Sequence, residues 1–376
     1  MDAQDTVSRA AIQVGTDVEA TSLLFQGRSV PGRVSRIALT ELPLEWSGVA
    51  ALMLIDAAWA ARIGFSLTVV WLDCVVPLLA VAAIVTFRAI VRQERGALIA
   101  EYFILSIAAT AAFAVLSYLC CTAAYHLVDD DLLQLDRALG FDWQLWFRLL
   151  QGHPAVVSVL KMTYDSLAYQ GLYFTVLFGL LLRRIELREM FWTVFIAGLF
   201  TSAGSVLLPA LGTFEMFKLT SLGDYLPDMQ QLRAGSDLHF ALGRLKGVVN
   251  FPSFHTTMAV VYAYAFRRTG LFGYIIIAIN VTMLLSIPFI GGHYLVDMIG
   301  GTGVAVASIL LARRLLVRRR SAARSAISNS GGACSIPSLS YLAPSASPPQ
   351  RLPPLRPFLL LTRDGGRLTS DPNRAR

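Results

Sequence analysis

The sequence has few charged residues for its length. Asp, Glu, Lys and Arg make up 15% of the 376 residues, whereas soluble domains usually carry about 25%. Hydrophobic residues account for 55%. They gather in repeated, almost uncharged runs of about 20 residues, the length that a helix needs to cross a membrane. This shortage of charge excludes an ordinary soluble protein and predicts a polytopic membrane protein.

Cysteine is also scarce. Cys120 and Cys121 are neighbours, Cys74 lies in another apolar run, and Cys334 lies near the C-terminus. This arrangement fits neither a disulfide framework nor a zinc motif, so we expect small packing residues. The first 45 residues have no short apolar segment beside a basic start, and we therefore expect no cleavable signal peptide.

The net charge of +7 does not point to nucleic acid. From Ser321 onward the chain has seven Arg against two Asp, a net of five positive charges. This end of the chain is also rich in Ser, Pro and Gly, a composition typical of disorder. We expect a disordered basic tail at 317–376 and no nucleic-acid partner.

Eight apolar runs are expected to be transmembrane helices, because a backbone exposed to lipid must satisfy its own hydrogen bonds. Their hydrophobicity is continuous and does not alternate, which excludes a barrel. The expected spans are 47–66, 68–87, 97–121, 165–182, 190–211, 253–267, 271–290 and 294–313. The sequence thus predicts an all-α polytopic protein with three parts ahead of the tail. These are a cytoplasmic segment at 1–46, N-terminal membrane helices at 47–121 and a functional membrane domain at 122–316.

Arginine clusters indicate the orientation of these helices, since short cytoplasmic loops are enriched in basic residues. Clusters follow the second, fourth, sixth and eighth runs: Arg88, Arg92 and Arg95; Arg183, Arg184 and Arg188; Arg267 and Arg268; and Arg313, Arg314, Arg318, Arg319 and Arg320. With these clusters in the cytoplasm, the loops 122–163 and 212–252 lie on the outer face. All four clusters agree, and only the first hairpin is less well determined.

The outer loop 122–163 is more than a linker. Apolar residues recur in it at helical spacing, with a break at Gly140: Leu132, Leu135, Leu139, Trp143, Trp146, Phe147 and Leu150. Two compatible interpretations stay open. The helices lie in the membrane interface, or they form a lid packed on the bundle.

The motif Pro252-Ser253-Phe254-His255 opens the sixth run. Pro and Ser ahead of an apolar segment mark a helix start. Ser253 as N-cap leaves some of the following N–H groups free, and free N–H groups with the helix dipole attract phosphate. His255 then points into this anion site, although a histidine at a helix start also has a purely structural interpretation.

The motif Gly291-Gly292-His293-Tyr294-Leu295-Val296-Asp297 opens the eighth run. His293 and Asp297 are four apart and share a helix face. The carboxylate can hold the proton of one ring nitrogen and leave the other as a nucleophile. Taken alone, the motif also fits a His–Asp pair that braces two helices. The topology brings His255 to the same outer face, and the three side chains together suit a two-step phosphoryl transfer.

The two motifs, 38 residues apart from histidine to histidine, resemble the second and third motifs of the type 2 phosphatidic acid phosphatase superfamily. The forms F-P-S-F-H and G-G-H-Y-L-V-D are most similar to the branch with inositol phosphorylceramide synthase. The resemblance covers about 130–316 and implies a six-helix core with its active site at the outer membrane face. It implies that His293 becomes a phosphohistidine, that Asp297 orients it and that His255 is the general acid. It also implies a lipid phosphoester substrate in the bilayer, with no metal and no cofactor.

The sequence departs from the family pattern at basic positions. Ser286-Ile287 stands where the third motif often begins Ser-Arg, and the first motif, a Lys with a downstream Arg-Pro, is absent. Phosphoryl transfer still needs cations or N–H donors around the phosphate oxygens. We expect Ser253, Lys246 and Arg244 to bind phosphate, and Arg233 with less weight. Each of these cations also fits a solvated loop position.

The expected function is therefore a lipid phosphatase or phosphotransferase, with hydrolysis and transfer to a hydroxyl both open. Tyr164, Asp165 and Gln170 are further candidates to line the site from the side. The alternative is a transporter or flippase that has lost catalysis, because buried ionisable residues also mark transport paths. The usage of Ala, Arg and Gly favours a bacterial inner membrane, with the site facing the periplasm. The oligomeric state is left open.

Overall fold

The computed structural model describes residues 42–330. The chain divides into two units, Met1–Ala322 and Ala323–Arg376. The first unit contains the fold described below, and the described residues of the second belong to the end of the last helix. Most of the expected cytoplasmic segment at 1–46 lies outside the described residues, as does the expected tail beyond Ser330.

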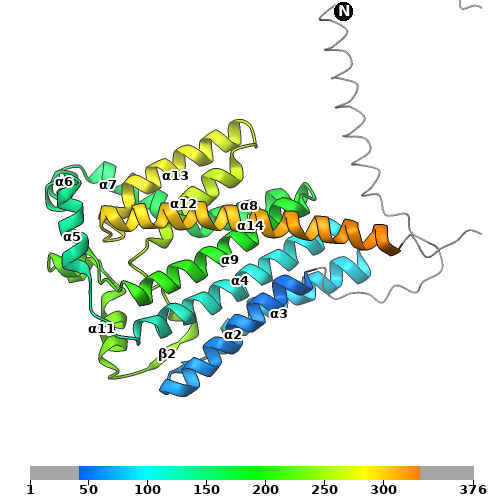
Figure 1. The fold of residues 1–376 in the computed structure, drawn as a ribbon, viewed down its shortest axis with the longest axis horizontal. Coiled ribbons are helices and arrows are strands. Elements are labelled where there is room, and N and C mark those ends of the chain that lie inside the picture. Colours follow the sequence, from blue (N-terminus) through cyan, green and yellow to red (C-terminus); the bar gives the residue numbers. More distant parts are fainter. Residues whose placement is uncertain (1–41, 331–376) are drawn as a thin grey trace, which may run out of the picture. The chain divides into compact units, whose positions relative to one another are not determined.

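The described residues are mostly helical (Figure 1). The long helices are α2 (Pro43–Ile63), α3 (Trp71–Val85), α4 (Glu94–Cys121), α9 (Arg184–Leu207), α13 (Leu271–Ile290) and α14 (Leu295–Ser330). The shorter ones are α5 (Asp129–Ala138), α6 (Trp143–Gln151), α7 (Pro154–Asp165), α8 (Leu167–Leu180), α10 (Thr213–Met216), α11 (Leu226–Ala234) and α12 (Phe254–Phe266). There are also a π-helical segment η1 (Thr86–Ile90), two 3-10 turns η2 (Thr220–Leu222) and η3 (Leu242–Arg244), and two strands β1 (Ser66–Thr68) and β2 (His239–Ala241).

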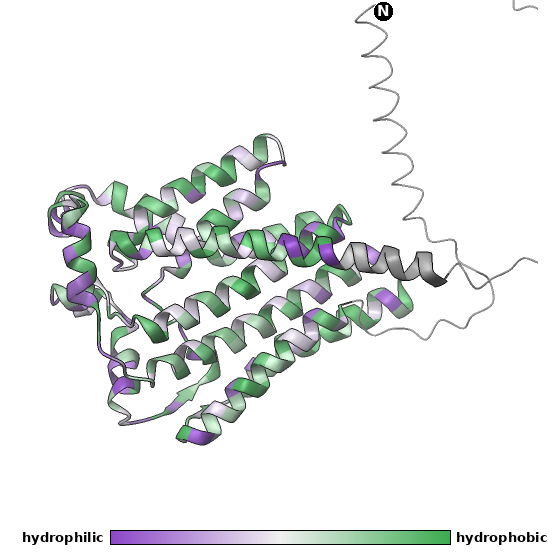
Figure 2. Cartoon of the chain, viewed as in Figure 1, coloured by the Kyte–Doolittle hydropathy of each residue, from purple (hydrophilic) through white to green (hydrophobic). Residues whose placement is uncertain are grey.

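Six helices in the described part of the chain are long and apolar enough to cross a membrane. They are Pro43–Ile63, Asp73–Ile90, Glu94–Cys121, Arg184–Leu207, Leu271–Ile290 and Leu295–Arg318. Figure 2 shows hydrophobic residues along the lengths of the long helices. The expected runs 165–182 and 253–267 are helical too, but α8 and α12 have only 14 and 13 residues. The structure therefore supports an all-α membrane protein with six candidate spans, not eight of full length.

The last helix continues further than the hydrophobic pattern indicated. We expected the eighth span to end near 313, but α14 runs to Ser330 and takes in the first part of the segment expected to be disordered. The sequence offers a reason, since no Gly or Pro occurs between Gly303 and Gly331. Gly and Pro are the two residue types that disfavour a helix most strongly.

A two-stranded parallel sheet joins two parts of the chain that are far apart in sequence. Ser66 pairs with His239, Leu67 with Phe240 and Thr68 with Ala241. The strand β1 lies in the link between α2 and α3, and β2 lies in the long segment between α9 and α12. Both segments are therefore at the same end of the helices, which agrees with the expected topology of the first hairpin. The strands were not predicted, because three residues are too few for a clear alternating pattern.

The loop 122–163 folds into α5, α6 and α7, with Gly140 between the first two at φ +79°. Figure 1 shows α5 and α6 at the end of the long helices where α14 begins. Trp143 is buried, stacks on Phe147 and Phe217, and donates its indole N–H to the carbonyl of Pro288 at 2.8 Å. These contacts support the lid interpretation, and the exposed side chain of Trp146 leaves contact with the membrane interface as a prediction.

The sheet pairing predicts that residues near β1 and β2 face the same side of the membrane, and the arginine clusters predict that the α12–α13 link faces the other. We expect a membrane-impermeant maleimide applied to sealed vesicles to label Thr68→Cys and Ser236→Cys together, in a variant without the native cysteines. Arg268→Cys serves as the comparison and should be labelled only after the membrane is opened. Thr68, Ser236 and Arg268 are all exposed. Labelling of Thr68→Cys and Ser236→Cys from opposite sides would contradict the topology.

Candidate active site

The start of α12 has the N-cap that the sequence predicts. The hydroxyl of Ser253, which is fully buried, accepts the N–H of Thr256 at 3.3 Å. The N–H of Ser253 in turn donates to the carbonyl of Asp297 at 3.1 Å, and the hydroxyl of Thr257 donates to the carbonyl of Gly301 at 2.9 Å. These contacts bring the first turns of α12 and α14 together, and with them the two sequence motifs.

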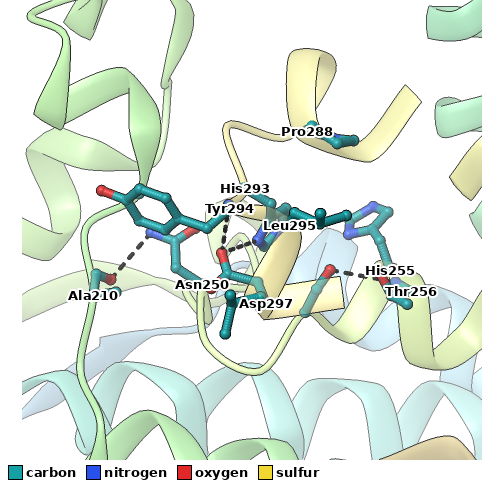
Figure 3. Close-up of polar contacts among 12 residues, drawn as sticks. Ala210, Asn250, His255, Thr256, Pro288, His293, Tyr294, Leu295 and Asp297 are labelled. Carbon is teal, nitrogen blue, oxygen red and sulfur yellow. Dashed lines mark hydrogen bonds and ion pairs between the residues drawn. The ribbon is translucent and has the colours of Figure 1, made fainter. Parts of the chain in front are cut away.

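His293 and Asp297 form the pair that their spacing indicates. The oxygen Oδ2 of Asp297 lies 3.2 Å from Nδ1 of His293 and accepts the N–H of Tyr294 at 2.9 Å (Figure 3). The Asp297 side chain is completely buried, and its other oxygen has no hydrogen-bond partner within the described residues. The pair therefore sits at the junction between α13 and α14, shielded from solvent.

Burial also governs the charge of the nucleophile candidate. His293 is only 3% exposed. Burial lowers the pKa of His293 to about 4, and a backbone hydrogen bond with Asn250 opposes this shift in part. The direction is that expected for a histidine whose charged form is poorly solvated. At neutral pH the ring is therefore uncharged and retains a lone pair for attack on an electrophile.

Tyr164 lies against His255 and close to the backbone beside His293. The rings of Tyr164 and His255 are stacked, with centroids 4.1 Å apart, and the phenol oxygen lies 3.4 Å from Nδ1 of His255. A Cβ on Gly291 would lie 2.8 Å from Cδ2 of His293 and 2.9 Å from the phenol oxygen of Tyr164. The absence of a side chain at Gly291 thus leaves room for both groups. Tyr164 comes from the end of α7, so three elements meet here.

A layer of backbone contacts supports the His293 segment. The N–H of Thr213 donates to the carbonyl of Gly292 at 2.8 Å, and Gly292 has φ +69°, a conformation that suits glycine. The side-chain amide of Asn250 donates to the carbonyl of Ala210 at 3.2 Å (Figure 3). The segment after α9 and Asn250 therefore support the junction between α13 and α14.

Two buried carboxylates of α5 also reach this region, and they are not among the site residues predicted from the sequence. Asp129 accepts the N–H groups of Leu211 and Gly212 and the hydroxyl of Tyr294. Asp136 accepts the N–H groups of Leu295 and Val296. Burial raises the pKa of both carboxyl groups, and their backbone donors oppose the shift.

A signal for these carboxylates was present in the sequence. Asp129, Leu132, Leu133 and Asp136 follow the spacing i, i+3, i+4, i+7, which places them on one helix face. Two acids on the apolar face of an amphipathic helix are unusual and need partners.

The expected phosphate-binding cations are not in contact with the histidines. The ammonium of Lys246 pairs with the carboxylate of Asp224 at 2.8 Å and donates to the carbonyl of the same residue at 3.0 Å. Arg244 is exposed at the end of η3, and Arg233 donates to the carbonyl of Tyr125. Phosphate binding by Lys246 and Arg244 stays a prediction, and the loop charge of Asp224 explains where Lys246 lies.

Of the three residues expected to line the site from the side, one reaches the histidines and two do not. Tyr164 reaches the site, but Asp165 forms an exposed pair with Lys161, and Gln170 accepts a hydrogen bond from Asn280 at 2.7 Å between α8 and α13. In the described part of the chain, no three His, Cys, Asp or Glu side chains form a group that could hold a metal ion.

Comparison with known protein families gives a match over part of the chain. Residues 130–311 match a family model described as the PAP2 superfamily. Members of this superfamily are phosphatases, so the match supports an enzyme with a phosphatase-type function acting on a phosphoester. The matched range begins in α5 and ends in α14, and it includes both histidine motifs. No curated protein and no solved structure matches the chain.

The close approach around Gly291 gives a test of the site. We expect Gly291→Ala to reduce phosphatase-type turnover about 10- to 100-fold, because small displacements of reacting groups have effects of this size. The added methyl group must displace His293 or Tyr164, and it also lies 2.9 Å from the carbonyl oxygen of Ile287. Gly303→Ala is the matched control, since a Cβ at Gly303 meets no atom within 4 Å. Equal turnover in the two variants, at equal folded fraction, would show that this space is not part of the site.

Proposed function

We propose that the protein is a membrane-embedded lipid phosphatase or phosphotransferase that works through a phosphohistidine on His293. The single observation that carries this proposal is the buried His293–Asp297 pair, which faces His255 where α12 and α14 begin. A buried, neutral histidine oriented by a carboxylate is an activated nucleophile. A second histidine beside it can carry the proton of the leaving group.

In the first step Nε2 of His293 attacks phosphorus, and the bond from phosphorus to the leaving oxygen breaks. Asp297 holds the proton on Nδ1 and stabilises the positive charge that develops on the ring. Protonated His255 gives its proton to the leaving oxygen, so the first product departs as an alcohol and His255 becomes neutral. Burial and the neighbouring His293 lower the pKa of His255, so its charged form depends on the bound phosphate, whose opposite charge stabilises it.

In the second step neutral His255 takes a proton from the acceptor, whose oxygen attacks the phosphohistidine. The phosphorus–nitrogen bond breaks and its electron pair returns to His293. Water as acceptor gives hydrolysis, and a lipid or polyol hydroxyl gives transfer. The synthase-like motif forms favour transfer, and both reactions use the same side chains.

The start of α12 supplies donors for the phosphate oxygens. The hydroxyl of Ser253 accepts the N–H of Thr256. Within residues 42–330 the N–H groups of Phe254 and His255 have no hydrogen-bond partner. Such free groups at a helix N-terminus suit an anion. They reduce the need for the arginines that the superfamily motifs usually contain, and Lys246 or Arg244 can add charge if the loop closes over substrate.

The bilayer brings the substrate to this site, and we place the site on the outer, periplasmic face of a bacterial inner membrane. The competing function is a transporter or flippase without chemistry. The side chains favour catalysis over transport, because a nucleophile, its orienting group and an acid lie together at the starts of α12 and α14. These are His293, Asp297 and His255. A transport path has ionisable groups spread along the membrane normal.

The function is tested with purified protein in detergent, incubated with a panel of phospholipids and polyprenyl diphosphates and followed by mass spectrometry. We expect His293→Ala to lower turnover at least about 10³-fold, as loss of a covalent nucleophile does in other enzymes. His153→Ala, an exposed histidine at the start of α7, should keep full activity. Free phosphate indicates hydrolysis and new phosphodiester lipids indicate transfer. Full turnover by His293→Ala would contradict the mechanism, and transport activity with neither product would favour the competing function.

The low pKa of His293 predicts the pH dependence of the first step. A nucleophile with a pKa near 4 stays neutral through the range around pH 6.5 where an ordinary histidine gains its proton. We expect the rate of phosphohistidine formation, measured by rapid quench, not to fall on account of His293 until the pH approaches 4. Since His255 must be protonated, the rate should fall at high pH. A His255→Ala variant, assayed with a good leaving group, should lose that basic limb; an acid limb near pH 6.5 in this variant would contradict a buried neutral His293.

A further inference from the structure

The helix α5 contains two buried acids for which the proposed reaction has no use. Asp129 is 9% exposed and Asp136 is completely buried, whereas Asp130 and Asp131 between them are exposed. Burying a carboxylate costs free energy unless hydrogen bonds compensate. Both acids accept hydrogen bonds from groups in or next to the His293 motif.

Asp136 caps the helix that contains Asp297. Its two oxygens accept the N–H groups of Leu295 at 2.8 Å and of Val296 at 2.9 Å. These are N–H groups of the first turn of α14, which lack partners inside the helix. The carboxylate therefore sets the direction in which α14 begins, two residues after His293 and one residue before Asp297. Asp136 lies near the start of the matched range 130–311, whereas α14 lies at its end.

Asp129 holds the opposite side of the same junction. It accepts the N–H groups of Leu211 and Gly212 at 3.1 Å and 2.8 Å, and the hydroxyl of Tyr294 at 3.1 Å. Tyr294 is completely buried, and its own N–H donates to Asp297. The next residue after Gly212, Thr213, donates to Gly292. One side chain thus links α5, the segment after α9 and the residue beside the nucleophile.

We propose that Asp129 and Asp136 are positioning residues, by which α5 sets the geometry of the His293–Asp297 pair. This inference rests on the proposed function of that pair. It has a consequence for substrate binding. The N–H groups at the start of α14 would otherwise attract an anion, but Asp136 occupies them. The phosphate is directed to the start of α12, where His255 lies, and not to the start of α14.

The test compares Asp136→Asn and Asp129→Asn with Asp130→Asn, the same change at an exposed position of the same helix. An amide has one acceptor oxygen where the carboxylate has two. In Asp136→Asn the N–H of either Leu295 or Val296 therefore loses its acceptor, and the first turn of α14 is held less firmly. We expect kcat to fall about 10- to 100-fold in the two buried variants, the size of effect that displacement of reacting groups produces. KM should be nearly unchanged, because these side chains do not touch substrate. Asp130→Asn should behave as wild type.

A second measurement does not depend on turnover. The rate at which diethyl pyrocarbonate modifies His293 is followed by mass spectrometry, with the exposed His239 as internal reference and thermal unfolding as a check on folding. We expect the His293 rate, relative to that of His239, to change in Asp136→Asn and Asp129→Asn but not in Asp130→Asn. If the wild-type protein turns over no substrate, the proposed function fails while this arm still decides the positioning role.

Three results would overturn the proposal. The first is wild-type kcat in folded Asp136→Asn and Asp129→Asn. The second is a raised KM with unchanged kcat, which would place the acids in substrate binding. The third is a lower kcat with unchanged reactivity of His293, which would show that the acids act elsewhere.

Discussion

The backbone hydrogen bond from Ser253 to the carbonyl of Asp297 is the contact on which the site depends. Its donor lies at a helix start, where N–H groups have no partner inside their own helix, and its acceptor is a carbonyl in the first turn of α14. In an apolar bundle such N–H groups must find acceptors in neighbouring segments. The bond brings α12 against the first turn of α14, and His255 and His293 become neighbours as a result. The chemistry thus grows out of the way in which the bundle satisfies its polar ends.

The same constraint explains why so much of the segment outside the candidate spans is ordered around the junction. Trp143 donates to the carbonyl of Pro288, Asn250 donates to the carbonyl of Ala210, and the carboxylates of α5 accept backbone N–H groups on both sides of His293. Each contact satisfies a buried polar group, which is costly to leave unpaired. The lid formed by α5 and α6 is therefore part of the framework of the candidate site, because removing it would leave these polar groups exposed or without partners.

Several features of the molecule were predictable because they depend on neighbours in sequence. The apolar runs, the break at Gly140, the N-cap at Ser253 and the i, i+4 relation of His293 and Asp297 each involve only a few consecutive residues. Their outcomes agree with the pattern, apart from the ends of the helices. The shortness of α8 and α12 and the extension of α14 to Ser330 show that hydrophobicity indicates a helix better than it indicates its length.

By itself, the sequence determined the membrane character, the helical form of the runs and the identity of the two histidine motifs, since composition and local spacing carry that information. Only the tertiary structure decided what surrounds the motifs. Tyr164 stacks on His255 from 91 positions away, Asp129 reaches Tyr294 from 165 positions away, and Lys246 turns to Asp224. Such contacts form when packing brings remote elements together and buried polar groups take the nearest available partner. No local pattern encodes that choice, because it depends on which groups the folded bundle leaves unsatisfied.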